Sequence, residues 1–412
     1  MKKIGFILFV CLGILIARFL DFYSQSPTYS LGQPVSFSHT FLQDPQINRF
    51  GIQTLYTNGL LIAFSEDKIF QYGDTVVISG IVGEKSFFST KENRVIKQKV
   101  LDKVRVEEKS NPNFILALAF VIRQKVSDTF YSVLPRNEAG LLIGIVFGIR
   151  SSMEKELTDA FRSTGVLHVV AASGTNVTMV GEILLLSLIP FVKRRIAVLF
   201  TVAGIFFYAL IAGLAPSILR AAIMASFAYG AVLFGRQNYS LLALLFAAFL
   251  MIIFQPNVIF DVGFQLSFMA TIGILFIKPF FDRVKFGQKF FIFDDFSTTT
   301  SAQITTLPIM VFVFSTYSLI GLVVNPLVLW TIPILMILGG LAAVFSLVLP
   351  ILSIPFLYIS YPLLVYFEQV TLFFAQYSFP FQLENMPLTL ILGYYCILLG
   401  VMLHWQKKRH KI

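Results

Sequence analysis

The feature that most restricts this chain is a series of long apolar segments that begins after residue 113. A run of about 18 or more apolar residues can cross the hydrocarbon core of a bilayer as a helix. Inside the bilayer only helices and closed barrels satisfy every backbone N–H and C=O group. Unbroken runs of Leu, Ile, Phe and Ala favour helices, because barrel strands alternate apolar and polar residues. The sequence therefore predicts a mainly α, polytopic protein that crosses the cell (inner) membrane several times.

Five spanning helices are expected in the middle of the chain, at approximately residues 166–190, 196–214, 216–235, 239–255 and 258–278. Residues 113–134 and 153–165 mix apolar and charged residues, and the first of these is expected to lie along the membrane surface. Residues 139–150 are too short to span and are expected to re-enter the membrane or to be half-buried in it. After residue 300 there are four or five further candidates, interrupted at Pro308, Pro326 and Pro333.

Lysine and arginine flank these apolar segments and account for most of the net charge of +10. The clusters at 193–195, at Arg236 and at 278–289 would all be cytoplasmic, because cytoplasmic loops are rich in Lys and Arg. Successive crossings give this arrangement if residues 21–165 stay outside the cell. We therefore attribute the basic clusters to membrane topology before nucleic-acid binding.

Residues 30–109 are polar, rich in β-branched side chains and interrupted by turns such as Asn58-Gly59. This pattern predicts a small extracytoplasmic β-barrel of the OB type. In its last strand four basic residues share one parity and would form one basic face: Lys97, Lys99, Lys103 and Arg105. Two interpretations remain open, a solvated outer face, which is the commoner case, and a set of candidate DNA-contacting residues.

The predicted organisation has five parts. Residues 1–22 form an uncleaved N-terminal membrane anchor, 30–109 the OB-like domain, 113–165 amphipathic and re-entrant helices, 166–350 the main membrane domain, and 351–412 C-terminal transmembrane segments with a basic tail. The two cysteines and four histidines are scattered, so neither a metal site nor another cofactor is expected.

Polar residues inside the predicted spans are the candidate functional residues, because a buried ionisable group in lipid is costly and usually faces a bundle interior or water. In VLHVVAASGTNV, residues 166–177, a helix would place His168, Thr175 and Glu182 on one face, with a break at Ser173-Gly174. The small residues fit close helix packing as well as a water-lined wall, and both interpretations remain open.

Two further segments carry polar residues. Arg220 stands in APSILRAAIM and must find water, a carboxylate or a phosphate, because a guanidinium stays charged. In DVGFQLSFMATIGI, Asp261 and Gln265 are one turn apart, so Asp261 could pair with Arg220 or line the same passage. Phe264 and Phe268 flank this face and are expected to serve packing more often than base stacking.

These segments, together with TLPIMVFVFSTYSLIGLVVNPLVLWTIP, resemble in order and spacing the ComEC competence channel family. The resemblance extends from about residue 30 to about residue 350, so residues 166–350 would be the competence channel domain. It implies an extracytoplasmic OB-like domain and a membrane domain that carries one DNA strand inward during natural transformation. The resemblance places His168, Ser173, Gly174, Arg220, Asp261, Gln265 and Asn325 on family motif positions.

Two departures from the family pattern affect what can be expected. Asn176 stands where histidine is common, which puts any imidazole role there in doubt. Many members also carry a C-terminal metallo-β-lactamase-like domain, for which these 412 residues leave no room. The full set of candidate pore-lining or motif residues is His168, Ser173, Gly174, Thr175, Asn176, Glu182, Arg220, Asp261, Gln265 and Asn325.

The expected function is a channel for single-stranded DNA across the cytoplasmic membrane during natural transformation, without enzymatic activity. The segment GIVGEKS, 80–86, does not match a phosphate-binding loop, so movement would need a separate cytoplasmic ATPase or single-strand-binding protein. Other expected partners are an extracytoplasmic DNA receptor, the lipid bilayer and, as an open alternative, further copies of the chain. The alternative function is a secondary transporter or lipid-linked exporter with a midplane polar site. A hydrolase using Ser173 and His168 is disfavoured because residues five apart lie on different helix faces.

Overall fold

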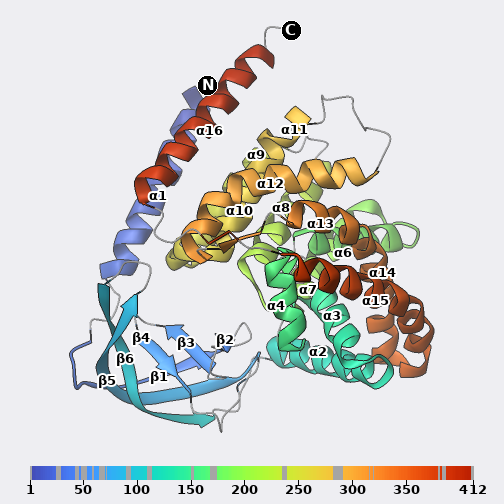
Figure 1. The fold of residues 1–412 in the computed structure, drawn as a ribbon, viewed down its shortest axis with the longest axis horizontal. Helices are drawn as coiled ribbons and strands as arrows, with labels where there is room; N and C mark the ends of the chain where they lie inside the picture. The colour runs from blue at the N-terminus through green and yellow to red at the C-terminus, as the bar shows by residue number, and fades with distance from the viewer. Residues whose placement is uncertain are drawn as a thin grey trace.

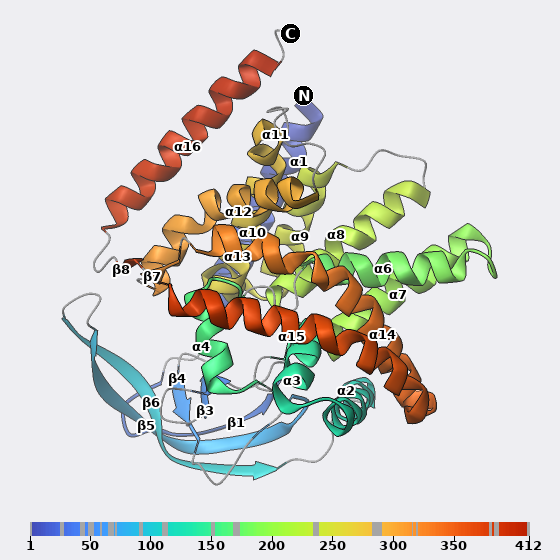
Figure 2. The same cartoon turned by 45° about the vertical axis from the view of Figure 1, so that its right-hand side comes forward.

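A computed structural model describes residues 2–24, 29–41, 46–47, 53–57, 60–64, 70, 72–89, 94–108, 114–149, 153–167, 174–233, 239–281, 291–314, 316–318, 320–378, 381–382 and 387–409. Its parts are an N-terminal helix, α1 (Lys2–Ser24), a curled β-sheet and a body of helices (Figure 1). The sheet lies against one end of the helical body, and the last helix, α16 (Leu388–Arg409), extends from the opposite part (Figures 1 and 2).

The sheet has the strand order β1-β5-β6-β4-β3-β2. Its strands are β1 (Pro34–Thr40), β2 (Gln46–Ile47), β3 (Gln53–Thr57), β4 (Leu60–Ala63), β5 (Thr75–Ser89) and β6 (Arg94–Glu108). All pairs are antiparallel except β4 with β6. Because β1 and β2 are neighbours in the chain yet form the two edges, the sheet curls around an apolar core that includes Leu60, Ile62 and Ile78. The expected barrel is thus a curled half-barrel, similar to the partly open form of small OB-type barrels.

A β-bulge in β6 overturns the single basic face expected on this strand. Ser79 pairs with Arg105 but Ile81 pairs with Asp102, so β6 holds one extra residue between these pairs. Such a residue reverses which parity faces outward. Lys99 has the parity of the core residue Leu101, although its own side chain is exposed, whereas Arg105 lies on the outer face. The side chains of Lys97 and Lys103 lie outside the described residues.

The helical body contains α2 (Phe114–Val133), α3 (Arg136–Phe147), α4 (Lys155–Ser163), α6 (Gly174–Leu188), α7 (Arg194–Ile211), α8 (Pro216–Leu233), α9 (Ser240–Phe254), α10 (Val262–Phe276), α11 (Lys278–Phe281), α12 (Phe291–Phe314), α13 (Gly321–Leu329), α14 (Thr331–Val348) and α15 (Ile354–Gln376). Short 3-10 helices precede α10 and α15, η1 (Pro256–Phe260) and η2 (Pro350–Ser353), and strands β7 (Thr316–Tyr317) and β8 (Phe381–Gln382) pair with each other.

Four helical stretches among the described residues are long and apolar enough to cross a membrane. They are Arg194–Ile211, Val262–Phe281, Thr331–Val348 and Pro350–Gln376, and the shorter apolar helices Gly174–Leu188, Ser240–Phe254 and Thr389–Met402 accompany them. The protein is therefore a multi-pass membrane protein. The central spans predicted from hydropathy coincide with α6 to α10, although residues 168–173 of the first lie outside the described residues.

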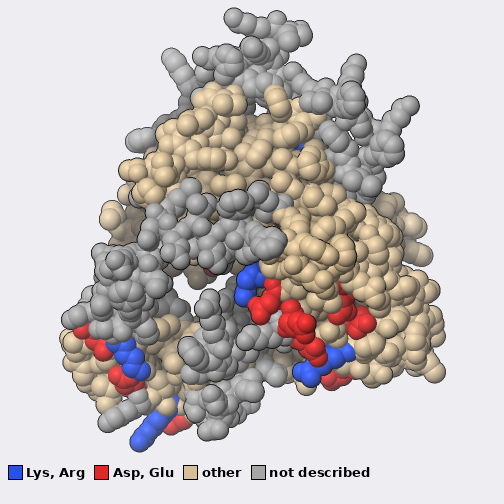
Figure 3. Space-filling model, in the orientation of Figure 1, with Lys and Arg blue, Asp and Glu red and all other residues tan. Residues whose placement is uncertain are grey.

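Charged side chains are unevenly distributed over the described surface. In the view of Figure 3 they gather on the sheet and on the adjoining end of the helices, whereas the described surface farther from the sheet is almost entirely uncharged. Large apolar side chains such as Leu199, Phe254 and Val348 are exposed on the helices. This is the pattern expected where the solvent around the helices is lipid.

Helix α3 lies at the centre of the helical body and is buried along almost its whole length. Every residue from Glu138 to Phe147 is buried, and α2, α14 and α15 pack against it. Gly339 of α14 permits this, because a Cβ there would lie 2.7 Å from Cγ2 of Val146. The helix is about 18 Å long at 1.5 Å per residue, too short to span. The segment is therefore a core helix; its re-entry into the membrane stays a prediction.

Tyr72 connects the sheet to the helical body. Tyr72 is 1% exposed and belongs to the apolar core of the helices. Its hydroxyl donates a hydrogen bond to the carbonyl of Leu210 at the end of α7. The guanidinium of Arg123 in α2 lies 5.2 Å from the centre of its ring. The amphipathic pattern of α2 thus has its buried side turned toward the sheet and the core; its placement on a membrane surface stays a prediction.

Candidate functional site

Arg220 is the point at which three of the polar sequence segments meet. It lies in the second turn of α8 and is 9% exposed. Its Nη1 donates to the carbonyl of Ser267 and to the hydroxyl of Thr271, both on α10. The ring of Phe268, on the same helix, lies 5.9 Å from the guanidinium carbon. The Nε of Arg220 has no hydrogen-bond partner among the described residues.

Gly174 of α6 also lies against the guanidinium of Arg220, in addition to the contacts from α10. It is the first residue of α6, and a Cβ there would lie 2.9 Å from Nη2 of Arg220 and 3.3 Å from Cβ of Ala221. Any larger residue would therefore press on the guanidinium. A residue with a Cβ at the glycine of the ASG motif would make the guanidinium of Arg220 shift, because α8 brings this side chain against the backbone of α6.

Asp261 and Gln265 have local roles at the start of α10. Asp261 is exposed and caps the helix, since its Oδ1 accepts from the N–H of Phe264 at 2.8 Å. Gln265 donates from Nε2 to the carbonyl of Ile259 at 2.9 Å. Within the described chain no ion pair joins Asp261 to Arg220, so the first of the two alternatives, pairing, is not seen there, and the lining of a passage stays a prediction. Phe264 is buried in an apolar cluster, as the packing interpretation expected.

The polar face predicted on the first motif is only partly described. Thr175 and Glu182 are exposed on α6, on the side opposite to the buried Val177 and Gly181. His168 and Ser173 lie outside the described residues. A polar row on an otherwise apolar helix fits contact with water or with another protein surface, and its contact with a passage stays a prediction.

Asn176 belongs to the protein interior. It is 1% exposed, and its Nδ2 donates to the carbonyl of Ile145 at 2.7 Å. The hydroxyl of Tyr208 donates to the next carbonyl, that of Val146, also at 2.7 Å. The last carbonyls of a helix lack partners within it, so these two side chains complete the C-terminus of the buried α3. This accounts for an amide at a position where histidine is common in the family that the sequence resembles.

Helix α12 carries a polar surface that our reading of the sequence missed. Its segment STTTSAQITT, 297–306, is rich in hydroxyl groups, and Ser297, Ser301 and Thr305 are completely buried. Several of these hydroxyls donate to carbonyls one turn back, which allows Ser and Thr in an apolar setting. The signal in the sequence is the density of hydroxyl groups in a segment that contains no ionisable residue.

Helix α12 also packs closely on α10, the helix whose Ser267 and Thr271 accept hydrogen bonds from Arg220. A Cβ at Gly273 of α10 would lie 2.3 Å from the carbonyl oxygen of Ser301. Pro308 cannot donate to the carbonyl of Ile304, and the hydroxyl of Tyr394 in α16 donates to that carbonyl at 2.9 Å. The chain therefore supports a proline-interrupted helix directly beside α10.

Asn325 lies in α13, immediately before Pro326, and is completely buried. Neither its Oδ1 nor its Nδ2 has a hydrogen-bond partner among the described residues. One turn earlier in α13, Gly321 is in tight contact with two other segments. A Cβ there would lie 3.0 Å from the carbonyl oxygen of Thr164 and 3.4 Å from Nε2 of Gln303. The segment that leads into the first motif is thus pressed against α13.

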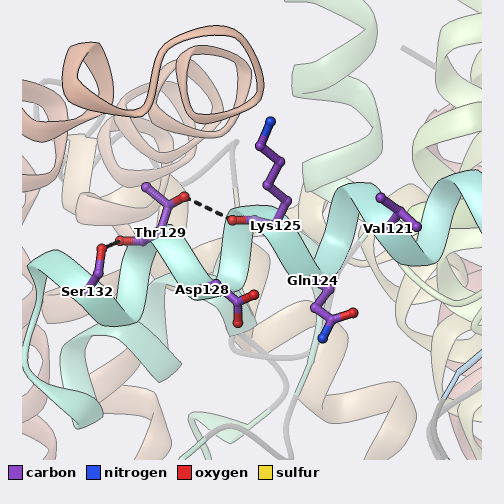
Figure 4. A pocket seen from close by; sticks show the side chains of 6 residues that line it. All are labelled: Val121, Gln124, Lys125, Asp128, Thr129 and Ser132. Atoms are coloured by element: carbon purple, nitrogen blue, oxygen red, sulfur yellow. Dashed lines mark hydrogen bonds between the residues drawn. The ribbon is translucent and has the colours of Figure 1, made fainter.

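Two cavities lie outside this polar region. One, of about 440 Å³, is a shallow hollow on α2 lined by side chains that include Gln124, Lys125 and Asp128 (Figure 4). The other, of about 380 Å³, lies on the outer face of the sheet beside the bulge, where Ser36, Ser79 and Arg105 border it. Neither is lined by the residues predicted for a pore. The described residues contain no group of three His, Cys, Asp or Glu side chains able to hold a metal ion.

Comparison with known proteins places these features in context. The family model described as "Competence: Competence protein" matches residues 145–408. ComE operon protein 3 of Bacillus subtilis (strain 168) is 27% identical over 225 residues, which cover 54% of this chain and 28% of that protein. An uncharacterised protein of Aquifex aeolicus (strain VF5) is 27% identical over 266 residues, 61% of each chain. The chain thus spans less than two thirds of either relative, and no solved structure matches it.

Proposed function

The chain belongs to the competence protein family, and from this premise we propose that it forms a passage for single-stranded DNA across the cytoplasmic membrane during natural transformation. A role in DNA uptake follows from the family, and the passage itself is our proposal. A polyanion cannot shed its water in lipid, so the passage has to be hydrated. The polar residues of α6, α8, α10 and α12 are the candidates for its lining.

The buried guanidinium of Arg220 is the observation that carries this proposal. It cannot become neutral at physiological pH, and the described residues leave its Nε without a partner. A backbone phosphate offers acceptors in the geometry that an arginine prefers. The present partners, Ser267 and Thr271, are neutral and belong to one helix. Transport needs contacts that can be exchanged for others, because tight binding would hold the strand in place.

The arrangement resembles a closed passage. Gly174 and Phe268 both lie close to the guanidinium of Arg220. Opening would separate α6 and α8 from α10 and let phosphates replace the contacts of Arg220. The hydroxyl groups of α12 would then supply hydrogen bonds to water along the route.

Partners complete the proposal. A receptor outside the cell would deliver the strand, and a cytoplasmic ATPase or single-strand-binding protein would pull it. The curled sheet offers a shallow groove beside Arg105 in which an extended strand could rest. If the chain assembles with further copies of itself, we propose that the exposed Thr175 and Glu182 on α6 contact the neighbouring copy.

Reconstitution tests the proposal directly. The full chain in liposomes should admit fluorescent single-stranded DNA to a nuclease-protected interior when a single-strand-binding protein is enclosed, and should exclude duplex DNA. A matched liposome with the Arg220→Met chain should admit far less. Equal protection with and without the chain, together with normal transformation of a deletion strain, would reject the passage.

A second function is favoured by one observation. Proline interrupts α12, α13 and α15, and the buried Asn325 lacks partners. Broken helices that carry unpaired polar groups are typical of secondary transporters. Such a protein would take up a small solute through the same liposome membrane with saturable kinetics, and would leave DNA outside.

A further inference from the structure

Buried polar atoms without partners concentrate at the contact between α12 and α13. Among the described residues they include Thr300 Oγ1 and Gln303 Oε1 on α12, and both Oδ1 and Nδ2 of Asn325 on α13. Asn325 is 0% exposed. Buried polar groups in proteins nearly always have a hydrogen-bond partner or a ligand. A completely buried amide with neither therefore indicates a site whose occupant comes from outside the chain.

Helix geometry turns these atoms toward a common seam. The side-chain amide of Gln303 reaches α13 at Gly321, where a Cβ would lie 3.4 Å from its Nε2. Asn325 follows Gly321 by four residues, which is a rotation of about 40° and one turn along the helix. Thr300 and Gln303 are likewise neighbours on one face of α12. Since α12 packs along α13, the helical spacing places the side chains of Thr300, Gln303 and Asn325 along the contact between the two helices.

The unpaired side-chain atoms of the seam are three oxygens and one donor nitrogen, Nδ2 of Asn325, and the hydroxyl of Thr300 can donate as well as accept. Pro326 has no N–H and cannot donate to the carbonyl of Leu322, so a further oxygen is freed beside Asn325. In α12 the equivalent carbonyl, that of Ile304, is satisfied by Tyr394. The oxygens of Thr300, Gln303, Asn325 and Leu322 are therefore the groups to be matched, and all are neutral. An anion would be repelled by this set, and a cation would be attracted.

We propose that the α12–α13 seam is a binding site for a dehydrated alkali cation, Na⁺ or K⁺, held by the oxygens of Thr300, Gln303 and Asn325 with the freed carbonyl of Leu322. Neutral oxygens replace the hydration shell of a monovalent cation in membrane proteins, and broken helices supply them. A divalent cation would require carboxylates, and the described residues offer no group of three acidic, His or Cys ligands.

Thermal unfolding of the full chain in lipid nanodiscs tests this site. Melting curves are compared in NaCl, KCl and choline chloride at equal ionic strength. A cation that binds only the folded state raises the melting temperature in a saturable way, so NaCl or KCl should raise it above choline chloride. The two salts also show which cation the seam selects.

Variants assign the effect to the seam. Asn325→Leu removes an unpaired amide and should fold at least as well as the parent, while its melting curve becomes the same in all three salts. Asn325→Asp should lower the cation concentration needed for half of the shift. Thr178→Val, at an exposed position on α6, is the control and should keep the shift.

The site is refuted if NaCl, KCl and choline chloride give coincident curves for the parent chain, or if Asn325→Leu retains the shift. Should Asn325→Leu fail to fold, Gln303→Leu and Thr300→Val take its place with the same expected loss. The cation site and the DNA passage are tested separately. If the chain passes DNA but its melting temperature does not depend on the cation, only the cation site is rejected. If the cation raises the melting temperature but DNA does not pass, only the passage is rejected.

Discussion

Replacing Arg220 with methionine separates a transport role from a structural role. Methionine is apolar, flexible and roughly as long as the stem of arginine, so it fills the space without a charge. Among the described residues the guanidinium donates hydrogen bonds to Ser267 and Thr271, and its Nε is without a partner there.

The expected change in stability is small because the contributions oppose one another. Hydrogen bonds from a charged group are worth about 1.5–3 kcal/mol each, so their loss costs about 3–6 kcal/mol. The substitution also removes two penalties of the native arginine. The unpaired Nε costs about 1–3 kcal/mol, and the burial of the charge costs several kcal/mol more. The free energy of unfolding should therefore change by less than about 2 kcal/mol, or increase.

Transport should respond differently. If Arg220 contacts phosphates, the loss of about 1.5–3 kcal/mol during passage lowers the rate roughly 10-fold to 100-fold. The assay is transformation frequency in a naturally transformable host that carries only the variant, with membrane abundance measured by immunoblot and stability by thermal unfolding. Arg162→Met, at an exposed arginine paired only with Asp159 among the described residues, is the matched control and should transform normally.

Two results would refute this reasoning. Normal transformation by Arg220→Met at normal abundance would remove the residue from the route. A loss of unfolding free energy above about 4 kcal/mol would instead show that Arg220 is mainly a tie between α8 and α10, because breaking a favourable buried interaction costs that much.

Three further predictions concern the packing of the helices and the stability of the sheet. Asn176→Ala should lower the free energy of unfolding by about 1–3 kcal/mol, because it leaves the carbonyl of Ile145 unpaired; an unchanged melting curve contradicts the capping role. Gly273→Val should cost about 1–3 kcal/mol or more in the same assay, since a Cβ there meets a backbone oxygen at 2.3 Å, whereas Gly340→Ala, in open space, should be neutral. Burial lowers the pKa of His39 below 6.5, so the folded sheet binds fewer protons than the unfolded chain. Sheet stability should then be full above about pH 6.5 and fall as the pH drops toward the lowered pKa. Hydrogen exchange of β1 amides at pH 7.5 and 5.5 measures this, and His39→Phe should lose the dependence; equal protection at both pH values in the parent would contradict it.

Hydropathy located the apolar helices well, because it is a property of consecutive residues. Among the five predicted central spans, Arg194–Ile211 and Val262–Phe281 are long and apolar enough to cross a membrane, and the crossing of the other three stays a prediction. The segments expected between residues 166 and 278 correspond to α6 through α10, with bounds that agree to within a few residues where the structure describes them. The same reasoning judged residues 139–150 too short to span. It did not reveal that α3 is the centre of the core, since burial by α2, α14 and α15 depends on where distant helices pack.

The strand pattern shows where local reasoning fails. Counting alternate residues placed Lys99 and Arg105 on one face, which is correct only for a strand without irregularities. One extra residue opposite Gly80 reverses the parity. Nothing in the local alternation marks that residue, because the bulge arises from how β6 pairs with β5.

The sequence by itself determined that this chain is a membrane protein and which of its apolar segments are helical. It also determined which few polar residues lie within those segments. Only the tertiary structure decided what those residues touch. Gly174, Arg220 and Thr271 are separated by about fifty residues each along the chain and meet at one guanidinium, whereas Asn176, only two residues from Gly174, turns instead to the end of α3. Position along a helix fixes the direction of a side chain, but its partner depends on which helix lies there, and that is settled by the packing of the whole body.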